Sequence, residues 1–134
     1  MRQKGRILVV ENIPIHQKVT TALLVRLGYE CDLVTNGHDA LTALMSTSYS
    51  VIFMDIDIPK MDGYETTRVI REFEKTQTAP WKNPIHIVAL TGCATQGERE
   101  NGIATGMNSY LTRPVSFAKL QAELDKVVPP IVAS

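Results

Sequence analysis

The stretch VIFMDIDIPKMDGYE, Val51–Glu65, decides the fold of this chain. Its first four residues, Val51–Met54, are all apolar, which is typical of a strand covered on both faces of a parallel sheet. Two acids, Asp55 and Asp57, follow this run at once, and apolar residues then recur with helical spacing through Glu65–Lys75. The stretch therefore predicts a buried strand, an acidic loop and an amphipathic helix in direct succession.

The same alternation of strand and helix runs along the rest of the chain. The other expected strands are Ile7–Val10, Glu30–Val34, Ile85–Leu90 and Ser109–Leu111. Four other helices are expected. The first begins at Pro14 and stops at Gly28, and the second follows Asn36 and Gly37 and includes Ala40–Met45. The third spans Gly97–Ala104, and the fourth follows Ser116 and includes Phe117–Val127. Five strands that alternate with five helices over short connections predict an α/β fold with a doubly wound parallel sheet.

Length and composition limit the function classes. With 134 residues the chain is about one domain, expected over residues 6–128 with flanking tails at 1–5 and 129–134. Lys plus Arg and Asp plus Glu both total 14, so the excess of positive charge that drives binding to nucleic acid is missing. The sequence contains neither a signal-peptide core nor ~20 consecutive apolar residues for a membrane span. We expect no direct partner among nucleic acids or membranes, and a cytoplasmic location, either alone or as the cytosolic piece of something longer.

Polar residues follow the carboxyl ends of the expected strands, where open parallel sheets bind ligands. They are Glu11, Asn12, Asp55, Asp57, Thr91, Gly92, Thr112 and Arg113. Carboxylates next to oxygen donors suit Mg²⁺, which typically binds through one or two carboxylates and a phosphate. A carboxylate held there can attack phosphorus, and a metal, a hydroxyl and a cation can stabilise the charge that develops.

Four ordered motifs resemble the receiver domains of two-component response regulators. They are ILVVEN (7–12), VIFMDIDIPKMDGYE (51–65), IVALTG (87–92) and GMNSYLTRPV (106–115). The resemblance covers almost the whole chain, from Ile7 to about Val128. The residues of the second and fourth motifs are most similar to those of receivers in hybrid histidine kinases. It implies a flavodoxin-like sandwich, with strand order 2-1-3-4-5 and five helices.

The resemblance also assigns roles to single residues. Asp55 matches the aspartate that accepts phosphoryl from a phosphohistidine. Mg²⁺ would be held by Glu11, Asn12, Asp55 and the backbone carbonyl of Asp57. Thr91 matches the hydroxyl that contacts the phosphoryl group, Arg113 the cation beside it, and Tyr110 the aromatic switch that turns inward on activation, with Gly92 leaving the phosphoryl approach open.

Three positions depart from the family pattern. Asn12 stands where a second acid is usual, which predicts weaker Mg²⁺ binding. Arg113 replaces a lysine, and a planar guanidinium is not interchangeable with a compact ammonium. Ile13 replaces a polar residue, so the helix that begins at Pro14 is expected to lack a side-chain cap. Asp57 keeps a third acid at the edge, and either a compensating role toward the metal or repulsion of the phosphoryl group fits that position.

These residues support one leading function and two alternatives. The leading function is a phosphoacceptor receiver, which modifies itself and is not a turnover enzyme. The first alternative is a pseudo-receiver that binds partners without phosphorylation, and the remote one is a phosphatase with a DxD nucleophile motif at Asp55 and Asp57. A stand-alone receiver and a piece of a hybrid kinase are equally compatible with the sequence.

The resemblance also implies partners. A histidine kinase or a histidine phosphotransfer domain is expected to dock against the first helix around His16, Gln17 and Thr20. A homodimer through the face formed by Gly97–Val128 is a further expectation. Because His16, His38 and His86 lack a recognisable acid or nucleophile partner in the sequence, we expect them to be solvated or packed in the core.

Overall fold

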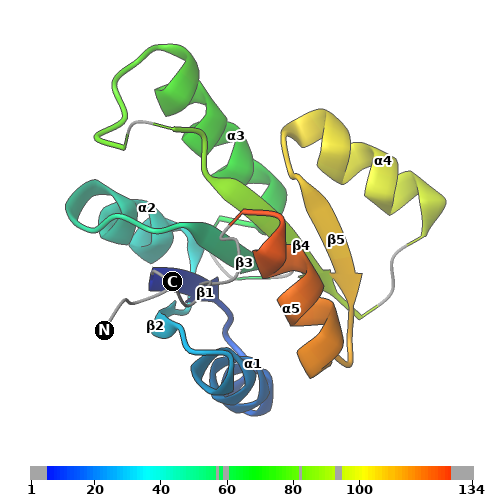
Figure 1. Ribbon diagram of the computed structural model, residues 1–134. Coiled ribbons are helices and arrows are strands. Elements are labelled where there is room, and N and C mark those ends of the chain that lie inside the picture. Colours follow the sequence, from blue (N-terminus) through cyan, green and yellow to red (C-terminus); the bar gives the residue numbers. More distant parts are fainter. Residues whose placement is uncertain (1–5, 57, 59–60, 82, 93–94, 128–134) are drawn as a thin grey trace.

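The computed structural model describes residues 6–56, 58, 61–81, 83–92 and 95–127, and these form a three-layer α/β/α sandwich (Figure 1). The strands are β1 (Arg6–Val10), β2 (Glu30–Val34), β3 (Val51–Asp55), β4 (His86–Thr91) and β5 (Ser109–Thr112). The helices are α1 (Pro14–Arg26), α2 (Gly37–Ser46), α3 (Gly63–Lys75), α4 (Gln96–Thr105) and α5 (Phe117–Asp125). All the strands pair in parallel in the order β2-β1-β3-β4-β5, which confirms the predicted fold.

Alternate residues of each central strand point to opposite layers of the sandwich. One core cluster joins Leu8, Ile52 and Ile87 of the sheet to Leu44 of α2 and Ile70 of α3. The other core cluster lies on the opposite face. It joins Ile7, Val9, Phe53 and Leu90 of the sheet to Leu24 of α1 and to Leu120 and Leu124 of α5. The sheet is therefore covered on both sides, as the apolar strand runs predict.

The register of the central strands brings the polar residues after them to the same level. Val10 pairs with Met54, so Glu11 and Asp55 both occupy the position that follows this pair. Asp55 in turn pairs with Leu90 of β4, and Thr91 pairs with Thr112 of β5. Parallel pairing therefore collects groups from four strands at one edge of the sheet.

Helix ends follow the local capping chemistry. Pro14 is the first residue of α1, and Ile13 before it makes no side-chain cap, as expected. Gly28, which follows this helix, has a positive φ of 96°, a conformation that glycine adopts readily. α3 begins at Gly63, two residues earlier than predicted, because the side chain of Asp62 accepts a hydrogen bond from the Glu65 amide at 2.8 Å.

The last two helices deviate little from expectation. α4 has a weak apolar pattern, yet the Thr95 hydroxyl caps its start and Gly106, with φ of 119°, ends it. α5 ends at Asp125, so the predicted continuation to Val127 is wrong by two residues. Among the described residues, none of the helices has both the length and the apolar character that crossing a bilayer demands.

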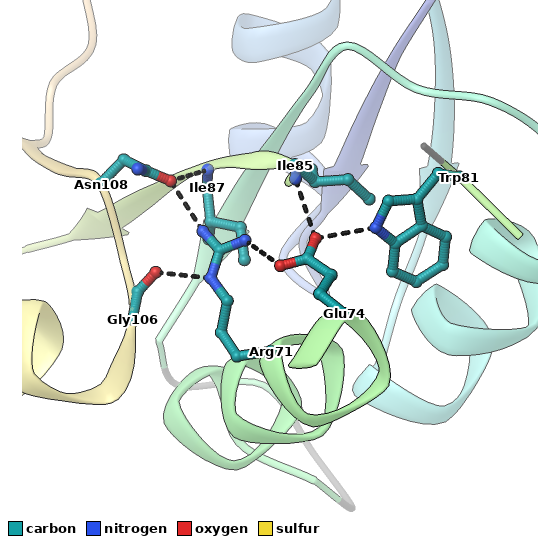
Figure 2. A network of polar contacts seen from close by, with 7 residues as sticks. All are labelled: Arg71, Glu74, Trp81, Ile85, Ile87, Gly106 and Asn108. Atoms are coloured by element: carbon teal, nitrogen blue, oxygen red, sulfur yellow. Dashed lines mark hydrogen bonds and ion pairs between the residues drawn. The ribbon is translucent and has the colours of Figure 1, made fainter. Parts of the chain in front are cut away.

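A polar network ties the end of α3 to the amino ends of β4 and β5 (Figure 2). The Glu74 carboxylate accepts hydrogen bonds from the Trp81 indole at 2.7 Å, the Ile85 amide at 2.9 Å and the Arg71 guanidinium at 2.7 Å. Arg71 also donates to the carbonyl of Gly106 at 2.9 Å and to the side chain of Asn108 at 2.8 Å. Trp81 packs on the core and is held in place by this network.

Replacement of Glu74 by alanine should destabilise the fold by about 2–4 kcal/mol, because the buried Ile85 amide and the Trp81 indole would both lose their acceptor. The measurement is urea unfolding followed by the fluorescence of the one tryptophan. Glu72→Ala is the matched control, since Glu72 is an exposed acid of the same helix, and its effect should stay within about 0.5 kcal/mol. Equal unfolding midpoints for the two variants would contradict the structural role of Glu74.

Candidate functional site

Two buried acids lie side by side at the carboxyl edge of the sheet. Glu11 follows β1 and is completely buried, while Asp55, the last residue of β3, is only 2% exposed. The carboxylate of Glu11 accepts a hydrogen bond from the Ile13 amide at 3.2 Å, and its backbone carbonyl accepts one from the Gln17 side chain at 2.8 Å. The start of α1 therefore holds Glu11 in place.

Arg113 supplies the positive charge of the site. Its guanidinium forms an ion pair with the Glu11 carboxylate, and the same nitrogen, Nη2, lies 3.4 Å from Oδ1 of Asp55. The Arg113 amide donates to the Thr91 carbonyl at 2.8 Å, which fixes the backbone next to β4. The peptide bond between Arg113 and Pro114 is cis.

The electrostatics of the site reflect this crowding. Burial raises the pKa of Glu11 to about 7, and the neighbouring Asp55 carboxylate adds to the rise through a hydrogen bond and its negative charge. The charge of Arg113 and the Ile13 amide act in the opposite direction. Two buried carboxylates this close require a cation between them or a shared proton.

The other predicted residues of the edge occupy the expected places. Thr91, 4% exposed, ends β4 next to Asp55. Gly92 is exposed, and a β-carbon built on it would meet nothing within 4 Å. Asn12 is exposed directly after Glu11. Asp57, predicted both as a carbonyl ligand and as a third acid, lies outside the described residues.

Two of the histidines lie near acids, which the sequence does not predict. Nδ1 of His16 lies 3.5 Å from Oε1 of Glu11, and Nε2 of His86 lies 3.5 Å from Oε1 of Glu123. His16 lies in the first turn of α1, and this helix packs beside the end of β1. Sequence spacing gives no signal for such a contact, because it depends on the direction in which α1 leaves the sheet.

Tyr110 lies apart from the acidic residues, between α3 and α4. Its hydroxyl donates to the Glu98 carbonyl of α4 at 2.6 Å and lies 2.8 Å from the hydroxyl of Tyr64 on α3. The ring packs against Gly102, where a β-carbon would come within 2.1 Å of it. Tyr64 and Gly102 were not identified from the sequence, although the helical register of Gly102 relative to Glu98 is compatible with one shared face.

A groove of about 290 Å³ adjoins the acidic residues. It is lined by His16, Val19, Thr20, Arg113, Pro114 and Val115, and so lies between α1 and the chain that follows β5. Arg113 therefore belongs both to the acidic site and to the wall of the groove. Near the groove, the apolar side chains of Ile15 and Val19 are 61% and 41% exposed.

The donor set of this edge fits a hard divalent cation. Within the described part of the chain no group of three or more His, Cys, Asp or Glu side chains is arranged to hold a metal. Mg²⁺ does not need such a group, because it keeps several waters and binds proteins through one or two carboxylates together with a phosphate. Glu11 and Asp55 supply two oxygen donors of this type.

Comparison with known proteins agrees with the geometry. The family model of the response regulator receiver domain matches residues 7–125. A relative in Oryza sativa subsp. indica, Probable histidine kinase 1, is 33% identical over 95% of this chain. The chain spans only 16% of the length of that kinase.

Two solved structures are similar throughout. The receiver domain of sensor histidine kinase PA1611 from Pseudomonas aeruginosa PAO1, which has a magnesium ion coordinated in its active site cleft, shares 39% identity and a TM-score of 0.80, with 94% of this chain and 98% of that one covered. The co-crystal structure of Saccharomyces cerevisiae Ypd1, a histidine phosphotransfer signaling protein, and the receiver domain of its downstream response regulator Ssk1 matches with a TM-score of 0.85 and 29% identity, covering 96% and 91%.

A doubly wound sheet in the order 2-1-3-4-5, buried acids at its carboxyl edge and a family match over most of the sequence lead to one conclusion. This chain belongs to the receiver domain family of response regulators in two-component histidine kinase systems.

Proposed function

We propose that this receiver domain accepts a phosphoryl group from a phosphohistidine onto Asp55. The observation that carries the proposal is the position of the Asp55 carboxylate, at the end of a fully buried strand, beside Glu11 and Arg113 and one strand from Thr91. We expect the phosphoryl group to approach from the side of Gly92, which is exposed and carries no side chain.

The reaction follows from these positions. An oxygen of Asp55 attacks the phosphorus, the new O–P bond forms as the N–P bond to imidazole breaks, and the leaving imidazole takes up a proton. The Arg113 guanidinium and the Thr91 hydroxyl stabilise the charge on the transferring oxygens. The product is an acyl phosphate on the domain itself, so this is a self-modifying module and not a turnover enzyme.

Magnesium is the cofactor of this proposal. Glu11, Asp55 and the backbone carbonyl of residue 57 would hold the ion, which neutralises phosphoryl charge when bound. Asn12, exposed beside Glu11, contributes no charge where the family pattern has an acid, so binding should be weaker. The PA1611 receiver domain, with its magnesium ion, supports this choice of metal.

The partner is a histidine kinase or a histidine phosphotransfer domain. The groove between α1 and the Pro114–Val115 segment is lined in part by Arg113 and by the exposed apolar side chain of Val19, and α1 also carries the exposed side chain of Ile15. An apolar surface beside a reactive carboxylate suits a helical partner that presents a histidine. The similarity to the Ypd1–Ssk1 complex supports such docking, and a cytoplasmic location follows from these partners.

A pseudo-receiver is the second candidate, and one observation favours it. Arg113 already pairs with both Glu11 and Asp55, so the acids have a counter-charge within the chain. In that case the domain would bind its partners through the same groove or through the face around α4 without phosphorylation. A homodimer through residues 97–128 is compatible with either function.

Incubation with acetyl phosphate or phosphoramidate tests the proposed function. The intact mass should rise by one phosphoryl group in the presence of Mg²⁺, and the rise should be absent for Asp55→Asn, which lacks the nucleophilic oxygen anion. No mass gain at any Mg²⁺ concentration, with the fold intact, would favour the pseudo-receiver. Slow turnover of a generic phosphate ester would instead point to the DxD phosphatase.

Tyr110 is the proposed link from Asp55 to the α4 surface. Because the Tyr110 hydroxyl gives its proton to the Glu98 carbonyl, the Tyr64 hydroxyl must donate to Tyr110. Burial and the hydrogen bond with Tyr64 raise the pKa of Tyr110. The ring packs directly against α4 because Gly102, which has no side chain, leaves space for it there.

Gly102→Ala should push Tyr110 outward, break its bond to Glu98 and lower the pKa of Tyr110 toward that of a free tyrosine. The clash should also destabilise the domain by about 1–3 kcal/mol. NMR titration of tyrosine ring carbons measures the pKa, and thermal unfolding measures stability.

The control is Gly97→Ala on the same helix, where an added β-carbon meets nothing within 4 Å. This variant should leave Tyr110 in place and stabilise α4 by about 0.5–1 kcal/mol. If the two alanine variants had the same effect on the pKa of Tyr110, the contact with Gly102 would not be what fixes the position of the Tyr110 ring.

A further inference from the structure

Arg113 occupies the position between the two buried acids. Its Nη2 atom contacts Oε1 of Glu11 in an ion pair and also lies 3.4 Å from Oδ1 of Asp55. The three side chains are 15%, 0% and 3% exposed, so water screens these charges little. One nitrogen of the chain thus stands where a cation bound by both carboxylates would stand.

We propose that Arg113 is an internal counter-cation that competes with Mg²⁺ for Glu11, so that metal binding requires the guanidinium to leave this carboxylate. The inference deepens the proposed function and rests on it in one respect, which is that the acidic edge is the Mg²⁺ site. It makes Arg113 a determinant of metal affinity that is separate from the missing acid at Asn12.

The surroundings of Glu11 support competition at one oxygen. Oε2 accepts the amide hydrogen of Ile13, which belongs to the fixed start of α1. Oε1 faces Arg113 and lies 3.5 Å from Nδ1 of His16. A metal ion that reaches Oε1 meets the guanidinium first, and two cations on one oxygen repel each other.

Arginine is suited to a buried ion pair of this kind. A guanidinium is more weakly hydrated than a lysine ammonium and is not interchangeable with it, and here a single nitrogen, Nη2, reaches both Glu11 and Asp55. The ion pair with Glu11 is therefore formed by Arg113, the residue that stands where the family pattern has a lysine.

The structure also offers the guanidinium a second place. The Arg113 amide donates to the Thr91 carbonyl at 2.8 Å, so the side chain can turn away from Glu11 while this backbone bond is kept. The groove of about 290 Å³ that adjoins the acids is lined by Arg113 itself, together with Thr20 and His16. A side chain that releases Glu11 can enter this groove without a change in the fold.

Calorimetric Mg²⁺ titration of the phosphate-free domain tests the proposal. Arg113→Gln should tighten Mg²⁺ binding by about tenfold or more, since affinity is commonly tuned over this range by groups around a metal. Arg113→Lys should give a smaller gain. Arg68→Gln, which removes the same charge from an exposed position on α3, should leave the affinity unchanged.

Asn12→Asp separates the two determinants. If the missing acid alone limits affinity, Asn12→Asp tightens binding while Arg113→Gln does not, and the proposal is overturned. If Arg113 competes, both single variants tighten binding and the double variant binds most tightly. Circular dichroism on each variant checks the fold, and Arg113→Lys decides the matter should Arg113→Gln fail to fold.

Nuclear magnetic resonance of the unaltered domain gives an independent readout. Addition of Mg²⁺ should shift the side-chain Nε–Hε signal of Arg113 as the guanidinium leaves Glu11, and an unmoved signal at saturating metal would overturn the proposal. These measurements use no phosphodonor. A domain that never gains phosphoryl mass can therefore still show the competition, and a phosphorylated domain can fail to show it.

Discussion

The burial of β1 and β3 on both faces is the constraint on which the rest of the molecule depends. Helices cover both sides of these strands, so every side chain from Ile7 to Val10 and from Val51 to Met54 is fully buried and apolar. A charge inside this layer would lose its hydration without compensation. Acids are therefore confined to the positions that follow the apolar runs, Glu11 directly after β1 and Asp55 at the end of β3, and parallel pairing places both at one edge.

The charge balance at that edge is set within the chain. Two substitutions relative to the family pattern act in the same direction, since Asn12 removes a negative charge and Arg113 extends a positive group toward Glu11. Burial raises the pKa of Glu11 to about 7, and the neighbouring Asp55 carboxylate adds to the rise while Arg113 opposes it. The two buried acids of the edge thus share a counter-charge that the chain itself supplies.

Most of the fold and the main site residues were predictable because they depend on local patterns. Nearly continuous apolar runs identify β1 and β3, shorter apolar stretches identify the other strands, and the positions after them single out Glu11, Asp55, Thr91 and Arg113. The missed features depend on tertiary geometry, such as the approach of His16 to Glu11. The start of α3 was placed two residues late because the pattern of apolar residues, and not the Asp62 cap, defined its expected boundary.

The contact between Gly102 and the ring of Tyr110 restricts the substitutions that these two positions can accept during evolution. A side chain larger than hydrogen at position 102 and an aromatic ring at position 110 exclude each other in this arrangement. Residue 102 can therefore not be enlarged alone, and a lineage that enlarges it must first shrink or reorient residue 110. We expect the two sites to be inherited as a pair, although they belong to different elements of the fold.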